Sequence, residues 1–148
     1  MMMKDWLRKH PDVRTIRVAA ADLNGQARGK RIPARFAENV VKNGTRFPFS
    51  VLNLDIWGED IDDSPLVFEQ GDQDGVLKPT ERGFMPMPWL EAPTALLPIW
   101  MFRENGTPYE GDPRHALRAV VERFKARGLT PVCAMELEFF LIDDSGKT

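Results

Sequence analysis

The sequence feature that most limits the possible folds is a run of apolar residues near the end of the chain, interrupted by two glutamates. In PVCAMELEFFLID, residues 131–143, Glu136 and Glu138 stand among apolar neighbours. Side chains alternate between the two faces of a strand, so the two carboxylates share one face at a separation of roughly 6–7 Å. Both faces are otherwise apolar, which is typical of a strand covered on both sides, as in a parallel sheet or a barrel.

Two carboxylates in a covered strand need compensation, because an unpaired buried carboxylate costs several kcal/mol. Arginines or lysines from elsewhere, protonation or divalent cations could each supply it. Carboxylate-rich sites suit Mg²⁺ and Mn²⁺, and two metals close together would match two neighbouring carboxylates. The spacing E-x-E is by itself a weak motif, and a solvated or arginine-paired strand is the alternative. The flanking apolar residues favour a metal site at Glu136 and Glu138.

A helix is predicted directly before this strand, in DPRHALRAVVERFKARG, residues 112–128. Asp112 is placed to cap it, Pro113 suits its first position and Gly128 can end it. An apolar stripe follows one face of this helix: Leu117, Val120, Val121 and Phe124. A helix that leads into a covered strand begins an α/β unit. We therefore expect residues 109–148 to be the truncated start of a second domain.

Residues 1–108 predict a first domain with a different organisation. Residues 13–33 read as a hairpin, because Asn24–Gly25 is a strong signal for a type I′ turn. A helix is expected at 34–42, with Phe36 and Val40 on one face and Gly44 after its end. Further strands are expected at 50–56, 66–68 and 94–102. Hairpin, helix and further strands is the order of a β-grasp sheet, which wraps one helix, so the expected fold class is α+β.

Composition and charge narrow the function classes. A net charge of −2 gives no general attraction to nucleic acid or anionic lipid. The sequence has no apolar stretch of signal-peptide or membrane-spanning length, and its one cysteine, Cys133, excludes an internal disulfide. These features favour a cytoplasmic protein. Cys133 is expected to be a buried inert thiol, and His10 and His115 are expected at the surface. The basic cluster has few interleaved aromatics, which favours a solvated or intersubunit sheet face over a nucleic-acid site: Arg14, Arg17, Arg28, Lys30 and Arg31.

The stretch DPRHALRAVVERFKARGLTPVCAMELEFFL resembles the start of the catalytic domain in the glutamine synthetase family. In that family a D-P-R helix leads through a glycine into a strand bearing E-x-E-F. The preceding segments DLNGQARGKRIP, LDIWGED, GDQDGVLKP and MPW resemble, in order and spacing, the N-terminal β-grasp domain of the family. The resemblance covers residues from about 13 to 143 and indicates the N-terminal portion of such a protein.

This resemblance implies a ligase that couples an amine to the γ-carboxylate of glutamate, with ATP as co-substrate and γ-glutamyl phosphate as intermediate. Glu136 and Glu138 would bind separate Mg²⁺ or Mn²⁺ ions, one orienting glutamate and the other neutralising phosphate oxygens. The family also implies a homo-oligomeric ring with active sites between subunits. A loop aspartate of the β-grasp domain, matched here by Asp55, would bind the incoming ammonium and help to deprotonate it.

The loop DIWGED departs from the D-G-S-S type of the ammonia-using members. Ile56 and Trp57 replace the small hydroxyl residues, so the loop looks more like that of the γ-glutamylpolyamine (γ-glutamylputrescine) synthetase branch. An aromatic wall at Trp57 suits the methylene chain of a diamine, and Glu59 and Asp60 could meet its distal ammonium. We therefore expect a polyamine or alkylamine acceptor. Packing of Trp57 in the core is the alternative for that residue.

Three other functions stay open. The first is a glutamine synthetase proper that uses ammonia, and the second is a non-catalytic β-grasp module for oligomerisation or regulation. A ligase homologue that has lost activity is the third. The 148-residue chain is itself expected to lack ligase activity, because it carries only part of the site.

Overall fold

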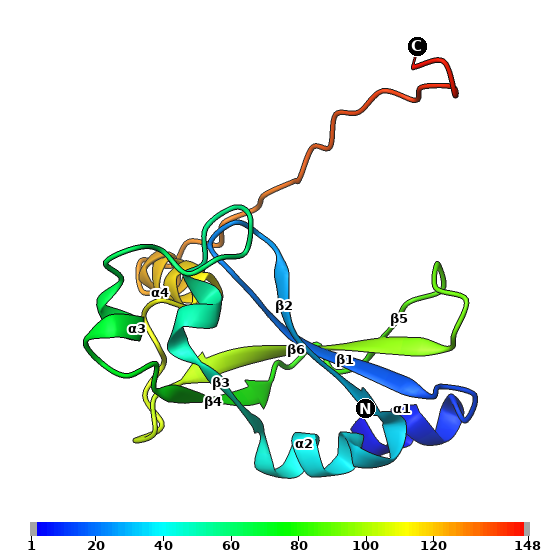
Figure 1. Ribbon diagram of the computed structural model, residues 1–148, viewed down its shortest axis with the longest axis horizontal. Coiled ribbons are helices and arrows are strands. Elements are labelled where there is room, and N and C mark those ends of the chain that lie inside the picture. The colour runs from blue at the N-terminus through cyan, green and yellow to red at the C-terminus, as the bar shows by residue number, and fades with distance from the viewer. Residues whose placement is uncertain (1–2, 147–148) are drawn as a thin grey trace. The chain divides into compact units, whose positions relative to one another are not determined.

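The computed structural model describes residues 3–146 and has the mixed α+β architecture that the sequence predicts. The chain divides into two compact units, Met1–Arg118 and Ala119–Thr148. Among the described residues, the first unit contains a six-stranded sheet in the order β2-β1-β6-β4-β3, with β5 paired to β6 outside this path (Figure 1). The strands are β1 Thr15–Ala21, β2 Ala27–Pro33, β3 Thr45–Pro48, β4 Asp74–Pro79, β5 Met85–Pro86 and β6 Thr94–Phe102.

Strand β6 is the centre of this sheet and agrees with the predicted strand at 94–102. It runs parallel to β1 and antiparallel to β4 and β5. The buried face alternates along β1 as Ile16, Val18 and Ala20. Two helices contribute to the same core: α1, Met3–Lys9, through Trp6, and α2, Ala37–Asn43, through Val40.

The predicted hairpin is confirmed as β1 and β2, but its predicted turn type is wrong. Among the described turn residues only Gly25 has a positive φ, of 77°, whereas a type I′ turn needs positive φ at both central residues. The loop is longer, running from Asp22 to Gln26, with the Asp22 amide donating to the Gln26 carbonyl at 2.9 Å. The side chain of Asp22 stabilises this longer loop, because its Oδ1 accepts the amides of Asn24 and Gln26 at 2.8 Å each.

The segment predicted as one helix at 34–42 begins with a 3₁₀ turn, η1, Ala34–Phe36, and continues as α2. Val40 faces the core as expected, but Phe36 is 49% exposed. A 3₁₀ turn has three residues per turn, so Phe36 falls outside the buried stripe of the helix that follows. Gly44 ends α2 as predicted, with φ 76° and its amide donating to the Val40 carbonyl.

The strand predicted at Ser50–Ile56 is wrong. The chain forms β3 earlier and then coils into a 3₁₀ helix, η2, Phe49–Leu52. Phe49 and Leu52 are both buried, and a spacing of three residues places side chains on one face of a helix, not of a strand.

The strand predicted at Leu66–Phe68 is also wrong. These residues belong to a short helix, α3, Pro65–Phe68, with a proline in its first turn, a position that proline favours. The strand lies further on, as β4, and begins inside the segment GDQDG, residues 71–75, whose Gly and Asp content is typical of a turn.

The helix predicted after Asp112 is confirmed as α4, Pro113–Lys125. Asp112 caps it, because its Oδ1 accepts the Arg114 amide at 2.9 Å. His115, expected at the surface, is buried. Its ring lies 4.9 Å from that of Trp100 and 4.8 Å from that of Phe102, so the first turn of α4 packs against β6.

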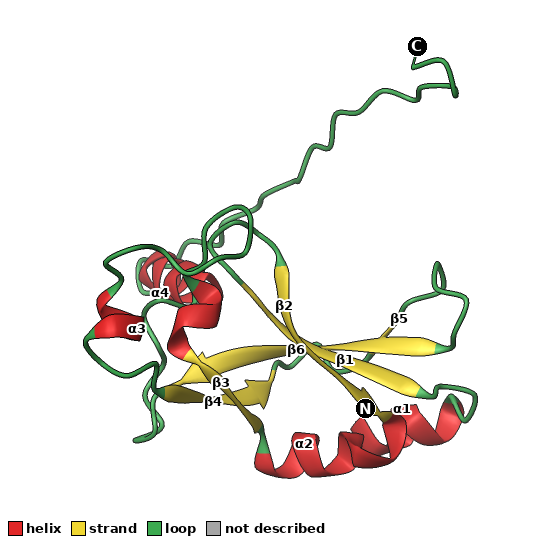
Figure 2. Cartoon of the chain, viewed as in Figure 1, coloured by secondary structure: helices red, strands yellow, loops and turns green. Residues whose placement is uncertain are grey.

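The second unit contains the rest of α4 and a long segment without regular secondary structure, drawn as loop in Figure 2. The strand predicted at 131–143 is not formed among the described residues. A strand needs hydrogen bonds from a neighbouring strand, and no described segment pairs with this one. Its side chains are accordingly exposed, including Cys133, which was expected to be buried. No described helix combines the length and the apolar character needed to cross a membrane.

Candidate functional site

The residues predicted to form the site are divided between the two units. Asp55, Trp57 and Glu59 lie in one loop between η2 and α3, in the first unit, whereas Glu136 and Glu138 lie in the second unit.

The loop around Asp55 wraps its backbone around the carboxylate. Oδ1 of Asp55 accepts the amides of Trp57 at 2.8 Å, Gly58 at 2.8 Å and Glu59 at 2.9 Å. The amide of Asp55 in turn donates to the Glu59 carbonyl at 3.0 Å. These amide hydrogen bonds, that of Glu59 first, hold the pKa of the Asp55 carboxyl below its usual value, and the positive charge of Arg28 acts in the same direction. Asp55 is therefore an anion at neutral pH.

Two large apolar side chains on this loop face solvent. Ile56 is 70% exposed and Trp57 is 82% exposed, so the alternative of core packing for Trp57 is wrong. Glu59 and Asp60 are exposed on the same loop. The loop thus presents a half-buried anionic carboxylate, an exposed indole and further exposed carboxylates within a few residues. Such a group can receive a cation that carries an apolar chain.

The turn of the β1–β2 hairpin supports this loop. The Asn24 side-chain amide donates to the carbonyls of Leu54 at 2.9 Å and Asp55 at 3.2 Å. Arg28 donates through Nε to Asp22 Oδ2 at 2.7 Å. A Cβ built on Gly58 would lie 2.8 Å from Arg28 Nη1, so the guanidinium lies against the loop backbone. The sequence marks Asn24 only as a turn residue and Arg28 only as part of a basic cluster, and neither signal indicates these contacts.

The carboxylate of Asp22 is the most enclosed charge in this region, with a side chain that is 0% exposed. Burial alone would raise the pKa of the Asp22 carboxyl. The hydrogen bonds from Arg28 and from the amides of Gln26 and Asn24 outweigh burial and hold that pKa below its usual value. Asp22 is therefore a buried anion that fixes the position of Arg28 and balances its charge.

Glu136 and Glu138 are exposed in the extended segment after α4. Their carboxylates are the oxygen donors that Mg²⁺ and Mn²⁺ prefer, but such ions take about six ligands. Among the described residues no group of three or more His, Cys, Asp or Glu side chains could hold a metal ion. The two glutamates therefore fit a divalent cation in chemistry, and they do not complete its coordination.

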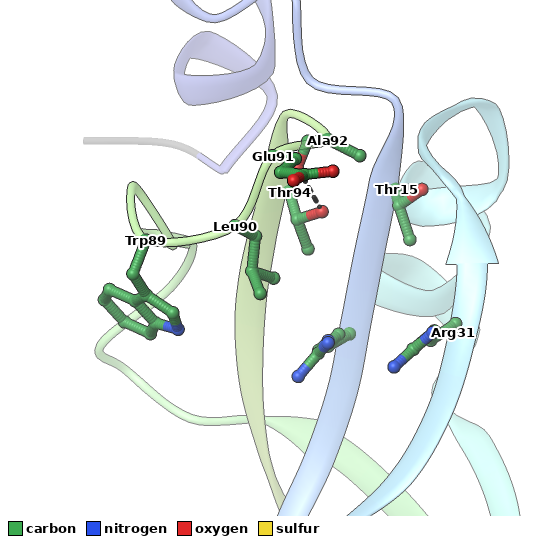
Figure 3. A pocket seen from close by; sticks show the side chains of 8 residues that line it. Thr15, Arg31, Trp89, Leu90, Glu91, Ala92 and Thr94 are labelled. Atoms are coloured by element: carbon green, nitrogen blue, oxygen red, sulfur yellow. Dashed lines mark hydrogen bonds between the residues drawn. The ribbon is translucent and has the colours of Figure 1, made fainter. Parts of the chain in front are cut away.

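A separate groove of about 400 Å³ is lined by side chains of β1 and β2 and by residues 89–92 of the loop before β6 (Figure 3). Its strand residues lie on the sheet face opposite the buried core, here called the outer face. Arg17 and Arg31 line it and stand directly opposite one another on β1 and β2. Trp89 projects from the loop beside it, and Glu91 is the one carboxylate among its described lining residues. None of the predicted site residues lines this groove. It belongs to the face that the sequence indicates to be solvated or intersubunit.

Comparison with known proteins gives matches along nearly the whole chain. Residues 110–148 match the family model "Glutamine synthetase, catalytic domain". The γ-glutamylputrescine synthetase PuuA of Escherichia coli (strain K12) is 34% identical over 141 residues, which cover 95% of this chain and 30% of PuuA. The glutamate–isopropylamine ligase of a Pseudomonas species is 29% identical over 147 residues, which cover 98% of this chain and 32% of that ligase.

A solved complex of GmaS with ADP matches with a TM-score of 0.65 and 25% identity, covering 85% of this chain and 26% of that one. The chain spans about a third of the length of the two curated relatives it matches.

Proposed function

Because the chain belongs to the glutamine synthetase family, we propose that it is the N-terminal part of an ATP-dependent ligase. The reaction couples the γ-carboxylate of glutamate to an amine through γ-glutamyl phosphate. The observation that carries this proposal is the similarity, along nearly the whole chain, to two such enzymes. One is named for the product γ-glutamylputrescine, and the other for the substrates glutamate and isopropylamine. The match to a GmaS complex with ADP supports the use of ATP.

We further propose that residues 1–108 form a β-grasp domain and that residues 109–148 begin the catalytic domain. The central parallel pair of β1 and β6, with α2 contributing to the core on one face, supports the first assignment. The family match that begins at residue 110 supports the second. A homo-oligomeric ring with sites between subunits, in the cytoplasm and without nucleic acid or membrane as partner, completes the proposal.

Glu136 and Glu138 are proposed as metal ligands. The remaining ligands would come from other parts of the protein, from substrate and from water. Bound Mg²⁺ or Mn²⁺ would neutralise phosphate oxygens during transfer. The two glutamates would contribute negative charge and oxygen donors to these ions, and they would lie on one face of a strand once that strand is paired.

The acceptor is proposed to be a polyamine or another alkylamine. Asp55 is ionised and would hold the ammonium group and accept its proton. The exposed indole of Trp57 would pack on the methylene chain, and Glu59 would pair with a distal ammonium. Ammonia is the alternative acceptor, but it has no chain that an exposed indole could bind.

An assay of ADP release by the full-length protein tests this function. It would contain glutamate, ATP and Mg²⁺ with ammonia, methylamine, putrescine or spermidine in turn. We expect turnover with the organic amines, and the highest kcat/KM with putrescine or spermidine. Turnover with ammonia alone would contradict the roles of Trp57 and Glu59. If no amine supports turnover, the ligase proposal is wrong and the non-catalytic module becomes the better explanation.

A further inference from the structure

We propose that Asn24 and Arg28, on the β1–β2 hairpin, are positioning residues for the Asp55 loop, residues 53–60. They hold this loop in the shape that receives the amine. This inference rests on the proposed function, because it takes Asp55 as the group that meets the amine. It adds two residues that lie about 30 positions earlier in the chain and that do not themselves contact the substrate.

The Asp55 loop fixes its own internal shape but not its place on the sheet. Its internal bonds join Asp55 to the amides of Trp57, Gly58 and Glu59. None of these bonds reaches a strand. Support from outside the loop comes from the hairpin turn. There the Leu23 amide donates at 3.2 Å to the carbonyl of Leu52, the last residue of η2 and the one directly before the loop.

Asn24 is the residue that orients Asp55 directly. One side-chain amide nitrogen donates to two successive carbonyls, Leu54 at 2.9 Å and Asp55 at 3.2 Å. This pair of bonds fixes the peptide plane that leads into Asp55, and hence the direction of its side chain. The hairpin turn does not need this side chain, because the turn is closed by the Asp22 carboxylate and backbone amides.

Arg28 supports the opposite end of the loop. Asp22 holds its Nε at 2.7 Å, and Gly58 lies so close to the guanidinium that a Cβ there would be 2.8 Å from Nη1. Gly58 also has a φ of 90°, which favours glycine. Arg28 thus limits how far the loop can move toward β2.

The charges fit an amine site. A free guanidinium beside Asp55 would repel an incoming ammonium, but Asp22 balances the charge of Arg28. On Asp55, Oδ1 is occupied by three amides. Oδ2 of Asp55 accepts no hydrogen bond from the described residues of this loop. That oxygen is therefore available to the ammonium group. The positioning residues therefore determine where Oδ2 stands.

The experiment uses the full-length protein with the amine that gives the highest kcat/KM. Variants are Asn24→Ala, Arg28→Lys, Asp55→Asn and the double variant Asn24→Ala with Asp55→Asn. Arg31→Gln is the matched control, since Arg31 lies on the same strand and faces the outer groove. The readouts are kcat, the KM values of amine, glutamate and ATP, and amide hydrogen exchange of a peptide that covers residues 53–60.

We expect Asn24→Ala to raise the amine KM about tenfold, from the loss of two hydrogen bonds, with glutamate and ATP KM values unchanged. Exchange at residues 57–59 should become faster in the same variant. Arg28→Lys keeps the charge and should give a smaller rise, and Arg31→Gln should match wild type. In the double variant, the loss of Asn24 should add little to the loss of Asp55, because both act on one interaction.

The outcomes separate this inference from the proposed function. An effect of Asp55→Asn together with wild-type amine KM and exchange in Asn24→Ala would overturn the inference and leave the function standing. Equal rises of all three KM values in Asn24→Ala would also overturn it, since they indicate a general structural defect. If the wild-type protein turns over no amine, the proposed function fails and the positioning role for amine binding fails with it, whatever hydrogen exchange shows about the loop.

Discussion

Two aspartates show how single residues in this chain are set for different tasks. Asp22 is buried, and its charge is matched by Arg28 and by backbone amides. Asp55 is half-buried, and amides on one of its oxygens lower the pKa of its carboxyl. Both are ionised at neutral pH. Both carboxylate oxygens of Asp22 accept hydrogen bonds, whereas only Oδ1 of Asp55 does so among the described residues. Only Asp55 can therefore take up a further cation without losing an existing bond.

The two glutamates after α4 can be tested one at a time. Glu136→Gln and Glu138→Gln in the full-length protein should each abolish turnover, because an amide cannot supply the negative charge of a metal ligand. Folding should change little in either variant, since replacing a carboxylate by its isosteric amide keeps size and shape. ADP release at saturating Mg²⁺ and thermal unfolding would measure the two effects.

A matched control for these variants is Glu122→Gln, which removes one exposed carboxylate from α4 in the same unit. It should keep wild-type turnover. If Glu136→Gln and Glu138→Gln behave like this control, the metal role of the two glutamates is wrong.

At the scale of elements, the start of α4 is fixed to β6 by one carboxylate and one imidazole. Oδ2 of Asp112 accepts the Met101 amide at 2.8 Å, while Oδ1 caps the helix. His115 packs between Trp100 and Phe102, and its Nε2 has no hydrogen-bond partner among the described residues. Burial lowers the pKa of the His115 imidazole from 6.5, against the opposing charge of Asp112. Protonation of His115 therefore weakens the contact between α4 and β6.

The lowered pKa of His115 makes the folded chain less stable at acidic pH. The unfolded chain binds the proton of His115 at about its ordinary pKa of 6.5, whereas the folded chain binds it only at lower pH. The free energy of unfolding should therefore fall as pH drops below 6.5 and should not depend on His115 above about pH 7.5. Urea unfolding of wild type and His115→Phe between pH 8 and pH 5.5 would measure it. Parallel curves for the two proteins would contradict the prediction.

The elements that could be predicted from sequence carry local signals. The β1–β2 hairpin has a turn signal, α4 has a cap and an apolar stripe, and β6 is a long β-rich run. The sequence does not predict β4, because glycine, here Gly75, is normally a turn residue. In the structure a Cβ at Gly75 would lie 2.7 Å from Met101 Cγ and 2.8 Å from Phe49 Cε1, so glycine is needed there for close packing. The sequence shows the glycine, but it does not show that Met101 and Phe49 pack against it.

The candidate site, too, can be predicted from sequence only where its residues are neighbours in the chain. Asp55, Trp57 and Glu59 are predicted together because they are contiguous in sequence, and the structure keeps them on one loop. The sequence does not indicate that Asn24 and Arg28 belong to the site, because their contacts to this loop span about 30 residues. Long-range pairing of a turn with a loop leaves no periodic pattern in the sequence.

At the scale of the whole molecule, the two units differ in how well their apolar residues are covered. The first unit buries a continuous core that includes Ile16, Leu97 and Ile99, each 0% exposed. In the second unit Leu137, Phe140 and Leu141 are each 83% exposed. An extended apolar segment of this kind favours pairing with further strands. Pairing would satisfy its backbone groups, and layers packed on the resulting sheet would cover both of its faces, as the sequence pattern predicts. Such an arrangement would bring other side chains to Glu136 and Glu138.

The incomplete coordination of the two glutamates leads to a prediction for the 148-residue chain alone. It should show no glutamate-dependent ADP release, because no described group of three or more suitable side chains could hold a metal ion, and phosphoryl transfer depends on metals that neutralise phosphate charge. The full-length protein in the same buffer, with Mg²⁺ and the preferred amine, is the positive control. Full-length Glu136→Gln is the negative control. ADP release by the short chain above that of the negative control would show that a working metal site forms from these residues alone, and would refute the division of the site proposed here.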